Sequence, residues 1–372
     1  MKRGDGVLVN TFTLHPVPSA IIHAGGRPVF VESGWDLRID MADLRQKAVA
    51  SGAKFLLLSH MRGEKNTCPR SSLLSWRFAL KVVLVWLAGH ICDMDALSCF
   101  CKELGITLIE DCAHSLGSYW NGQAVGSFGV ASCYSSQTNK LLNSGEGGIV
   151  TTEVDLIAAR IILLSGSYGH YASSGAVLAP AGGEGASLSL RVLEAEHNHT
   201  PNYSLRMTNL TAALLRPQLT GIKAKVALFN RHWDILERDL GADALFFLPP
   251  RPAGEDKVGT SFQFWLPSFQ EQQLGRFVEL ALSRGLSVSW FGRPEPAGFT
   301  SNIRHWGYIF DNKPISGEDA LTTADPELPK TLEVMRTLCD VPLYHTSTWS
   351  DGDFEAMAQM FRECAAEAWA QL

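Results

Sequence analysis

Short apolar runs alternate with segments of helical period through roughly the first two hundred residues, and this alternation constrains the fold more than any other feature. Four of the runs are expected to form buried strands, at residues 7–9, 27–32, 54–60 and 106–111. Helices are expected over residues 39–50, which have an acidic start, and over residues 93–105, whose apolar side chains share one face. Such alternation favours βαβ units, so we predict an α/β fold whose mostly parallel sheet lies between layers of helices.

Two further strands are predicted over residues 130–136 and 147–153, and the loop between them contains Lys140. The stretch SSQTNKLLNSGEGG, residues 135–148, spans this loop. Open α/β sheets place their ligand contacts at strand ends. The loop is therefore a candidate site, although a single loop lysine is weak evidence by itself.

The second half of the chain has a different organisation. A glycine- and serine-rich segment at residues 172–190 is expected to be a surface loop, and long helix is expected over residues 208–219 and 225–240. From about residue 245 a second unit is expected, with strands over 262–267 and 286–291, a helix over 271–285, and a closing helix whose Phe354, Met357, Phe361, Cys364 and Ala368 share a face. A chain of 372 residues is too long to fold around a single hydrophobic core. We therefore predict a large domain over residues 1–240 and a smaller C-terminal α/β domain over residues 241–372.

Charge and cysteine usage narrow the class of protein. The formal net charge is −6 and no basic run exceeds a few residues, which argues against a nucleic-acid binder. The apolar run at residues 73–89 contains Arg77 and Lys81 and is shorter than the roughly 20 residues of a membrane span, and the N-terminal stretch lacks the apolar core of a signal peptide. The eight cysteines show neither a CxxC pair nor zinc-like spacing, so we expect reduced thiols, no metal and a cytoplasmic protein acting on small molecules.

Asp111 ends the strand predicted before the Lys140 loop, and alone it would more often be a turn or capping residue. With Ala113, Ser135 and Lys140 it makes up the set that a pyridoxal phosphate site needs. The lysine amine forms a Schiff base with the cofactor aldehyde, the carboxylate keeps the pyridine nitrogen protonated, and hydroxyls hold the phosphate. Motifs of other site classes do not match. GEGG lacks the last glycine of the dinucleotide-binding motif GxGxxG, and Ser135 is too far from Lys140 for the SxxK motif of acyl-serine enzymes. The phosphate-binding motif GxxxxGK[ST] and the zinc motif HExxH do not occur.

At these residues the sequence resembles a known family, the DegT/DnrJ/StrS-type aminotransferases, which put amino groups on nucleotide-linked keto sugars with pyridoxal phosphate. The similar stretches are GDGVLVNTFT, HAGGRPVFVE, DMDAL, ITLIEDCAHSLGSYWNGQAVGSFGVASCYSSQTNKLLNSGEGGIVTT and RMTNLTAA. The resemblance runs from about residue 4 to about residue 240 and weakly to the end, and residues 109–148 are its specific part. It implies the fold type I of pyridoxal phosphate-dependent transferases and a homodimer with active sites at the subunit interface.

The resemblance also implies roles by position. Lys140 matches the Schiff-base lysine and Asp111 the partner of the pyridine nitrogen. Ser135 matches a phosphate ligand, Ala113 the residue packed under the ring, and His114 the position that approaches the phenolic oxygen of the ring. A structural role for His114 is an equal alternative.

Two further cofactor contacts are expected at less well matched positions. Asn202, just before Arg206 of the family's RM-x-N segment, corresponds to an asparagine that reaches the phosphate of the partner subunit, with a spacing two residues longer than usual. Phe12 is expected to stack on the cofactor, although the usual aromatic lies two residues later, at Leu14 of this chain. Packing in the core is the alternative for Phe12.

The chain departs from the family pattern in two places. The family has a Gly-Thr loop before the residues that match Gly4 and Asp5, so we expect an N-terminally truncated large domain that lacks half of the phosphate cup. Residues 64–89 are expected to be an atypical insert that divides one strand-to-helix connection, either as a retained intron or gene-model artefact or as a real surface insertion.

The function implied by the resemblance is transamination. The donor would be glutamate or glutamine, the acceptor a keto sugar or cyclitol, and Lys140 would move the proton between the substrate Cα and the cofactor. One alternative is a catalytically impaired relative that acts as a binding or regulatory module. Another is pyridoxal phosphate-dependent dehydration, which some members perform where this lysine is a histidine, and the presence of Lys140 counts against it.

Overall fold

The computed structural model of the chain describes residues 1–60, 90–138, 140–166, 185–293, 328–343 and 348–370, together with Ile303, Trp306 and Ile309. The predicted insert at residues 64–89 and most of the predicted surface loop at residues 172–190 lie outside the described residues. Within the described ranges, no helix has both the length and the apolar character needed to cross a membrane.

The central sheet has six strands, and most of it is parallel. Its strands are β1 (Gly6–Asn10), β2 (Arg27–Val31), β3 (Phe55–Ser59), β4 (Thr107–Asp111), β7 (Ala131–Ser135) and β8 (Gly148–Thr151). Their order is β2-β1-β3-β4-β7-β8, and only β8 is antiparallel to its neighbour. The register pairs Ser59 with Asp111 and Asp111 with Cys133, so the ends of β3, β4 and β7 meet at one edge of the sheet. The predicted α/β fold with a mostly parallel sheet is confirmed.

Helices follow most of the strands. Those predicted over residues 39–50, 93–105 and 208–219 are present, whereas the helices at residues 16–23 and 155–164 were not predicted. The helices are α1 (Pro16–His23), α2 (Met41–Ser51), α3 (Met94–Leu104), α4 (Asp155–Leu164), α6 (Gly185–Glu196) and α7 (Asn209–Leu219). Asp40 and Asp93 accept hydrogen bonds from backbone N–H groups in the first turns of α2 and α3, which fixes where these helices begin. Gly105 ends α3 with a φ of 61°, a left-handed conformation that other residues adopt at a cost.

The prediction of a surface loop through residue 190 is wrong at its end, because residues 185–190 form the first half of α6. The physical reason is tertiary packing. Leu193 of α6 is buried against Ala159, Ile162 and Leu163 of α4. This contact between helices stabilises a segment whose glycine and serine content alone indicates a loop.

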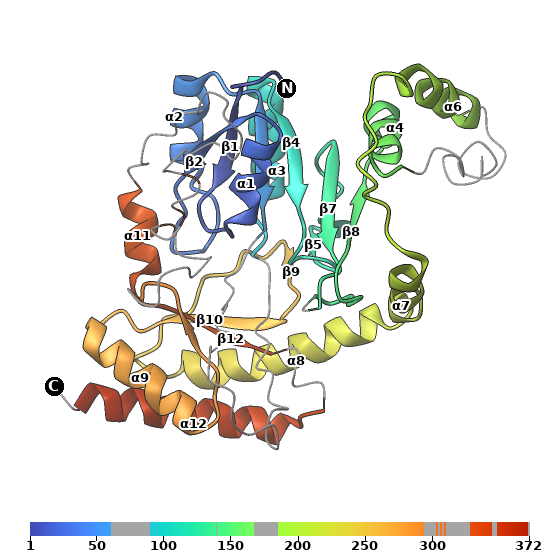
Figure 1. Ribbon diagram of the computed structural model, residues 1–372. Helices are drawn as coiled ribbons and strands as arrows, with labels where there is room; N and C mark the ends of the chain where they lie inside the picture. The colour runs from blue at the N-terminus through green and yellow to red at the C-terminus, as the bar shows by residue number, and fades with distance from the viewer. Residues whose placement is uncertain are drawn as a thin grey trace, which may run out of the picture.

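The two faces of the sheet bury alternate residues of the same strand. Leu8 of β1 lies in a cluster with residues of α2 and α3, whereas Val7 and Val9 lie in a cluster with Ile21 of α1 and Trp306. Helices therefore cover both faces, as predicted. Figure 1 shows this layered unit in blue and green, above a second unit in yellow and red.

The second unit is built on an antiparallel sheet with the order β10-β12-β11. Its elements are α8 (Ile222–Gly241), β10 (Ser261–Trp265), α9 (Glu271–Ser283), β11 (Ser289–Trp290), α11 (Pro329–Arg336), β12 (Leu338–Pro342) and α12 (Asp351–Ala370). Five residues of the closing helix α12 were predicted to share a face, and all five lie in the hydrophobic core of the second unit. Helices α8 and α12 run side by side beneath the sheet (Figure 1).

The two units share contacts across the predicted domain boundary. Trp233 and Leu236 of α8 precede residue 240 but belong to the core of the second unit. A small third sheet joins β5 (Tyr119–Trp120), β6 (Gln123–Ala124) and β9 (Glu255–Asp256), so the chain after residue 250 pairs with a hairpin of the first unit. The division into residues 1–240 and 241–372 stays a prediction.

Candidate active site

Asp111 is the last residue of β4, and its carboxylate is fixed by the neighbouring strand. Oδ2 accepts a hydrogen bond from Oγ of Ser59 at 2.8 Å, and Oδ1 accepts one from the backbone N–H of Ala113 at 3.0 Å. The residue is only 7% exposed. A buried carboxylate with two donors in place has a defined orientation at the sheet edge, which a cofactor contact requires.

Lys140 lies beside His114, so the two residues predicted from separate parts of the 109–148 block meet. Lys140 Nζ is 3.1 Å from Nε2 and 3.3 Å from Nδ1 of the His114 ring. His114 is buried in the turn that follows β4, whereas Lys140 is partly exposed in the loop that follows β7. The amine is therefore held against an imidazole rather than extended into solvent.

The loop that carries Lys140 is closed by hydrogen bonds between its two ends. Thr138 donates to the carbonyl of Gly145 through its backbone N–H at 2.6 Å and through its hydroxyl at 2.9 Å. The N–H of Lys140 donates to the carbonyl of Gln137 at 2.9 Å. Gly145 has a φ of 85°, in the region that favours glycine, so the GEGG stretch lets the chain turn back into β8.

A small cavity adjoins the amine. It is lined by Ala113, His114, Ser135, Lys140, Val258 and Thr260, among others, and its volume is about 10 Å³. This is room for about one water molecule. The cavity thus brings together four of the predicted site residues, and Asp111 adjoins it through its hydrogen bond to Ala113.

The donor set fits pyridoxal phosphate. Lys140 supplies a primary amine, Asp111 an oriented carboxylate, Ser135 a hydroxyl, and Ala113 a small side chain on which a flat ring can rest. The present volume does not hold a pyridine ring, because the Lys140 amine and the His114 imidazole are in contact. Binding therefore requires these two side chains to separate.

Two of the predicted cofactor contacts lie outside this cavity. Phe12 is 1% exposed and packs against Phe291, with ring centroids 5.6 Å apart, as the core-packing alternative expects. Asn202 is exposed and accepts a hydrogen bond from the backbone N–H of Ser204 at 2.8 Å. The side chain of Asn202 lies against Gly166, just after α4. A Cβ added to Gly166 would be 2.5 Å from Oδ1 of Asn202, which shows how close the two residues are. The cofactor roles of Phe12 and Asn202 stay predictions.

Sequence reasoning missed four lining residues: Leu116 and Leu141, which are close in the chain to predicted residues, and Val258 and Thr260, which are not. The positions of Val258 and Thr260 need a tertiary explanation. They follow β9, more than a hundred residues after Lys140, and neither belongs to a local motif. The fold brings them to the cavity because β9 pairs with β5, which lies just after His114 in the chain. No signal in the sequence alone points to them.

A group of possible metal ligands lies next to the site, and its chemistry argues against a metal. One atom each of His60, Glu110 and Cys112 come within 4.8 Å of one another. Glu110 Oε1 already accepts from the N–H groups of Phe128 and Gly129, and Oε2 accepts from that of Gly126. Burial, the largest effect, raises the pKa of the Cys112 thiol, so this residue is a poor thiolate donor.

The described cysteines agree with the prediction of reduced, mostly buried thiols. All seven are free, and five of them are buried. Burial raises the pKa of Cys101 to about 11, and burial followed by the charge of Asp111 raises that of Cys133 to about 12. Both thiols therefore stay protonated near neutral pH.

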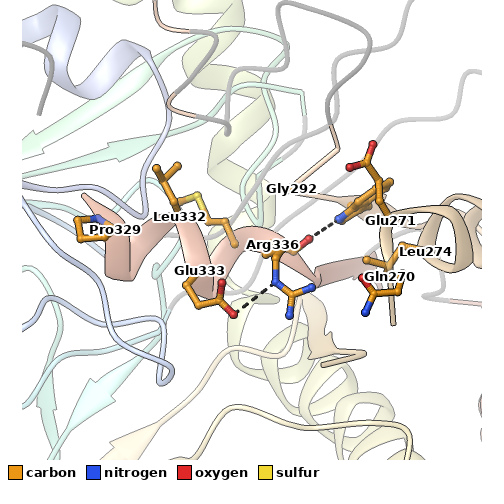
Figure 2. Close-up of a pocket in the computed structure, with 10 residues that line it drawn as sticks. Gln270, Glu271, Leu274, Gly292, Pro329, Leu332, Glu333 and Arg336 are labelled. Atoms are coloured by element: carbon orange, nitrogen blue, oxygen red, sulfur yellow. Dashed lines mark hydrogen bonds and ion pairs between the residues drawn. The ribbon is translucent and has the colours of Figure 1, made fainter. Parts of the chain in front are cut away.

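A larger cavity of about 380 Å³ lies between α9 and α11, away from Lys140 (Figure 2). Arg336 lines it, with Nε 3.3 Å from Oε1 of Glu333, and the carbonyl of Arg336 accepts a hydrogen bond from Nε1 of Trp290 at 2.7 Å. None of the described residues that line this cavity carries an amine, an imidazole or a thiol. Size alone therefore does not identify the active site, and the smaller cavity has the reactive groups.

Comparison with known proteins agrees with this location. A family model described as the DegT/DnrJ/EryC1/StrS aminotransferase family matches residues 76–280. The match begins inside residues 64–89 and contains Asp111, His114, Ser135 and Lys140. All of the residues that line the cavity thus fall within the matched region.

The match covers only part of the length of the curated relatives. GDP-perosamine synthase of Vibrio cholerae is 28% identical over 269 residues, which is 72% of this chain and 59% of that protein. A putative L-glutamine:3-amino-2,3-dideoxy-scyllo-inosose aminotransferase of Micromonospora echinospora is 42% identical over 166 residues, which is 44% of this chain and 33% of that protein. The chain therefore spans between about a third and three-fifths of the length of these relatives.

Solved structures share the fold. The crystal structure of an aminotransferase from Psychrobacter cryohalolentis matches with a TM-score of 0.71 and 18% sequence identity, over 98% of this chain and 82% of that one. At this level of identity the comparison supports the fold type I architecture and does not extend to substrates.

Proposed function

The chain belongs to the DegT/DnrJ/EryC1/StrS aminotransferase family, and we propose that it is an aminotransferase whose reactive amine is that of Lys140. Pyridoxal phosphate is the cofactor of the family. The observation that carries the proposal is the meeting of Lys140, His114, Ser135 and Ala113 around one cavity. An oriented Asp111 adjoins this group of residues through the N–H of Ala113.

Lys140, Asp111 and Ser135 have separate roles in the proposed reaction. Pyridoxal phosphate, when bound, supplies an electron sink for the electron pair left at the substrate Cα. Lys140 would hold the cofactor and, once the amino donor has displaced it, would take the proton from the substrate Cα and deliver it to the cofactor. Asp111 keeps a proton on the pyridine nitrogen, and Ser135 donates to the phosphate.

The substrate class is a keto sugar or cyclitol, with glutamate or glutamine as the amino donor. The support is the names of the relatives, one a GDP-perosamine synthase and another a glutamine-dependent aminotransferase of a scyllo-inosose. A catalytically impaired binding module is not favoured, because Lys140 and Asp111 are both in place at the sheet edge and the relatives are named as enzymes.

A homodimer, with active sites at the subunit interface, is part of the proposal. Two leucines one turn apart on α7 support it, because Leu210 is 74% exposed and Leu214 is 49% exposed. Exposed apolar side chains that gather on one helix mark an interaction surface. The cytoplasmic location expected from the sequence stays a prediction.

The experiment is to mix the purified chain with pyridoxal phosphate, reduce with borohydride and map the modified peptide. We expect the cofactor on Lys140 and a particle mass of two chains by light scattering. Lys140→Ala should lose the attachment and at least about 100-fold in the rate of amino transfer from glutamate to a panel of keto sugars. Lys223→Ala, an exposed lysine of α8, is the matched control and should behave like the wild type.

Three results would contradict parts of the proposal separately. Modification spread over many lysines would remove the assignment of Lys140. Attachment at Lys140 without transfer to any keto sugar would overturn the substrate class. A mass of one chain for the loaded protein would exclude the homodimer.

A further inference from the structure

The Lys140 loop is held from outside by a side chain 75 residues away in the sequence. Oε1 of Gln218, near the end of α7, accepts the N–H of Asn143 at 3.0 Å, and Nε2 of Gln218 donates to the carbonyl of Asn143 at 2.6 Å. Nε2 also donates to the carbonyl of Leu214 at 2.7 Å. The amide of Gln218 therefore uses its oxygen and its nitrogen in three hydrogen bonds, which fixes its orientation. Figure 1 shows α7 beside the lower ends of β7 and β8.

Asn143 connects this contact to the rest of the loop. Its backbone is bound by Gln218, while its side chain binds both ends of the loop. Nδ2 donates to the carbonyl of Thr138 at 2.5 Å, and Oδ1 accepts the N–H of Gly145 at 3.0 Å. A shift of Asn143 would therefore move the two residues between which Lys140 lies.

A second helix holds the same stretch at one further point. Nζ of Lys225, in the first turn of α8, donates to the carbonyl of Leu141 at 3.0 Å. Leu141 directly follows Lys140 and lines the same cavity. The start of α8 and the end of α7 thus contact consecutive parts of the loop, at residues 141 and 143.

We infer that Gln218 and Lys225 are positioning residues for the Lys140 amine. This inference rests on the proposed function and adds residues from α7 and α8 to it. Because the loop is already bound at residues 138, 141, 143 and 145, the backbone that carries Lys140 need not be ordered when the cofactor binds, and only the side chain has to move away from His114. Loss of these contacts should let the loop move, so that the Lys140 amine spends less time at the cavity.

The inference is tested first without cofactor. Hydrogen exchange of the peptide that contains residues 141–145 should be about tenfold faster in Gln218→Ala than in the wild type, because about two hydrogen bonds that hold Asn143 are lost. Gln359→Ala, which removes a glutamine that bonds Glu363 on the surface of α12, is the matched control and should leave this exchange unchanged. Unchanged exchange in Gln218→Ala would overturn the inference whether or not the chain binds pyridoxal phosphate.

The second measurement follows pyridoxal phosphate itself. In Gln218→Ala the dissociation constant for the cofactor should rise by about tenfold. The midpoint of the pH titration of its bound absorbance band should shift as well, because the surroundings of the Lys140 amine change. Gln218→Glu keeps the acceptor for the N–H of Asn143 but faces its carbonyl with a carboxylate, so it should lose at least as much affinity.

The outcomes separate the positioning role from a purely structural one. Faster exchange with an unchanged cofactor affinity and an unchanged pH midpoint would mean that Gln218 only stabilises the loop, and the inference would be wrong. Lys225→Met, which keeps the length of the side chain but not its charge, provides an independent test. It should also weaken cofactor binding and shift the midpoint, with the temperature of unfolding close to that of the wild type.

Discussion

Glu110 and Asp111 are consecutive residues of β4, so their side chains point to opposite faces of the sheet and have different partners. Asp111 faces the cavity and is bound by Ser59. Glu110 lies on the other face, where three backbone N–H groups of residues 126–129 donate to it and Nε2 of His60 lies 3.4 Å away. One strand end thus supplies the carboxylate that we propose contacts the cofactor and a carboxylate that holds the turn before β7.

The pKa values of the buried residues Glu110 and His60 are both shifted toward the charged forms. Burial alone lowers the pKa of His60, but its hydrogen bonds to Cys92 and Glu110 outweigh this effect and raise the pKa to about 9. Burial alone raises the pKa of Glu110, but the bond to His60 and those to the backbone keep it below its usual value. These shifts favour the imidazolium and the carboxylate near neutral pH.

We predict that this pair makes stability depend on pH on the alkaline side. The pKa of His60 is raised from about 6.5 to about 9 on folding, so its contribution is complete below about pH 6.5 and is lost as the pH rises through about 9. The free energy of unfolding of the wild type should fall by on the order of 2 to 3 kcal/mol across this window. Urea unfolding at several pH values measures it.

His60→Gln should flatten this pH dependence, whereas His197→Gln should keep it, since His197 is exposed. Glu110 also makes the free energy of unfolding depend on pH, but at acid pH, where stability falls as the pH falls. Its pKa is lowered on folding, so that its part is lost as the pH falls below about 4.5. A wild-type stability that is constant between pH 6.5 and 9.5 would show that His60 is not charged in the folded state.

At the scale of elements, the connection from β3 to α3 has two ends that lie close together. His60 follows β3 directly, and its ring is hydrogen-bonded to Cys92, two residues before α3 begins. The contact agrees with the sequence-based expectation that the residues around 60 and those around 90 are two halves of one connection. The three residues 61–63 can span about 10 Å when extended.

We therefore predict that a variant without residues 64–89 folds. Shortening a loop between ends that are already close lowers the entropy cost of closing it, by about 2 kcal/mol for this deletion. The circular dichroism spectrum and the temperature of unfolding should stay near those of the intact chain. A variant with a flexible glycine-serine segment of the same length is the control, and an aggregated or unfolded deletion variant beside a folded control would contradict the prediction.

At the scale of the whole molecule, one buried carboxylate joins segments from both units. Glu255 of β9 has a side chain with no exposed surface. It accepts hydrogen bonds from Nη2 of Arg38 at 2.8 Å, from Nη1 of Arg251 at 3.0 Å and from the N–H of Ile91 at 2.8 Å. These partners come from the segment after β2, the segment before α3 and the segment that leads into β9, so Glu255 is a junction of the fold.

Glu255→Gln should lower the free energy of unfolding by about 3 kcal/mol or more, because two buried guanidinium groups lose their counter-charge. Glu279→Gln is the matched control, since Glu279 is exposed on α9 and pairs with Arg276 at the surface. Chemical denaturation of both variants measures the difference. A loss of stability in Glu255→Gln no larger than in Glu279→Gln would mean that Arg38 and Arg251 find other partners or water.

The strands of the central sheet and the location of Lys140 at a strand end were accessible to sequence reasoning for a local reason. Strands buried on both faces are nearly continuous apolar runs, and the motif around Lys140 lies within 40 residues of Asp111. The start of α6, by contrast, depends on its packing against α4. Local composition does not contain such a contact.

The sequence by itself determined the α/β class, the order of the main elements and the set of side chains that meet at one sheet edge, because periodicity and the spacing of the motif act over short stretches of chain. Only the tertiary structure decided that Val258 and Thr260 complete the cavity, that Phe12 lies in the core, and that Gln218 and Lys225 hold the Lys140 loop. These contacts join residues far apart in the chain. Such pairs are specified by how sheets and helices pack, and that packing depends on every element at once.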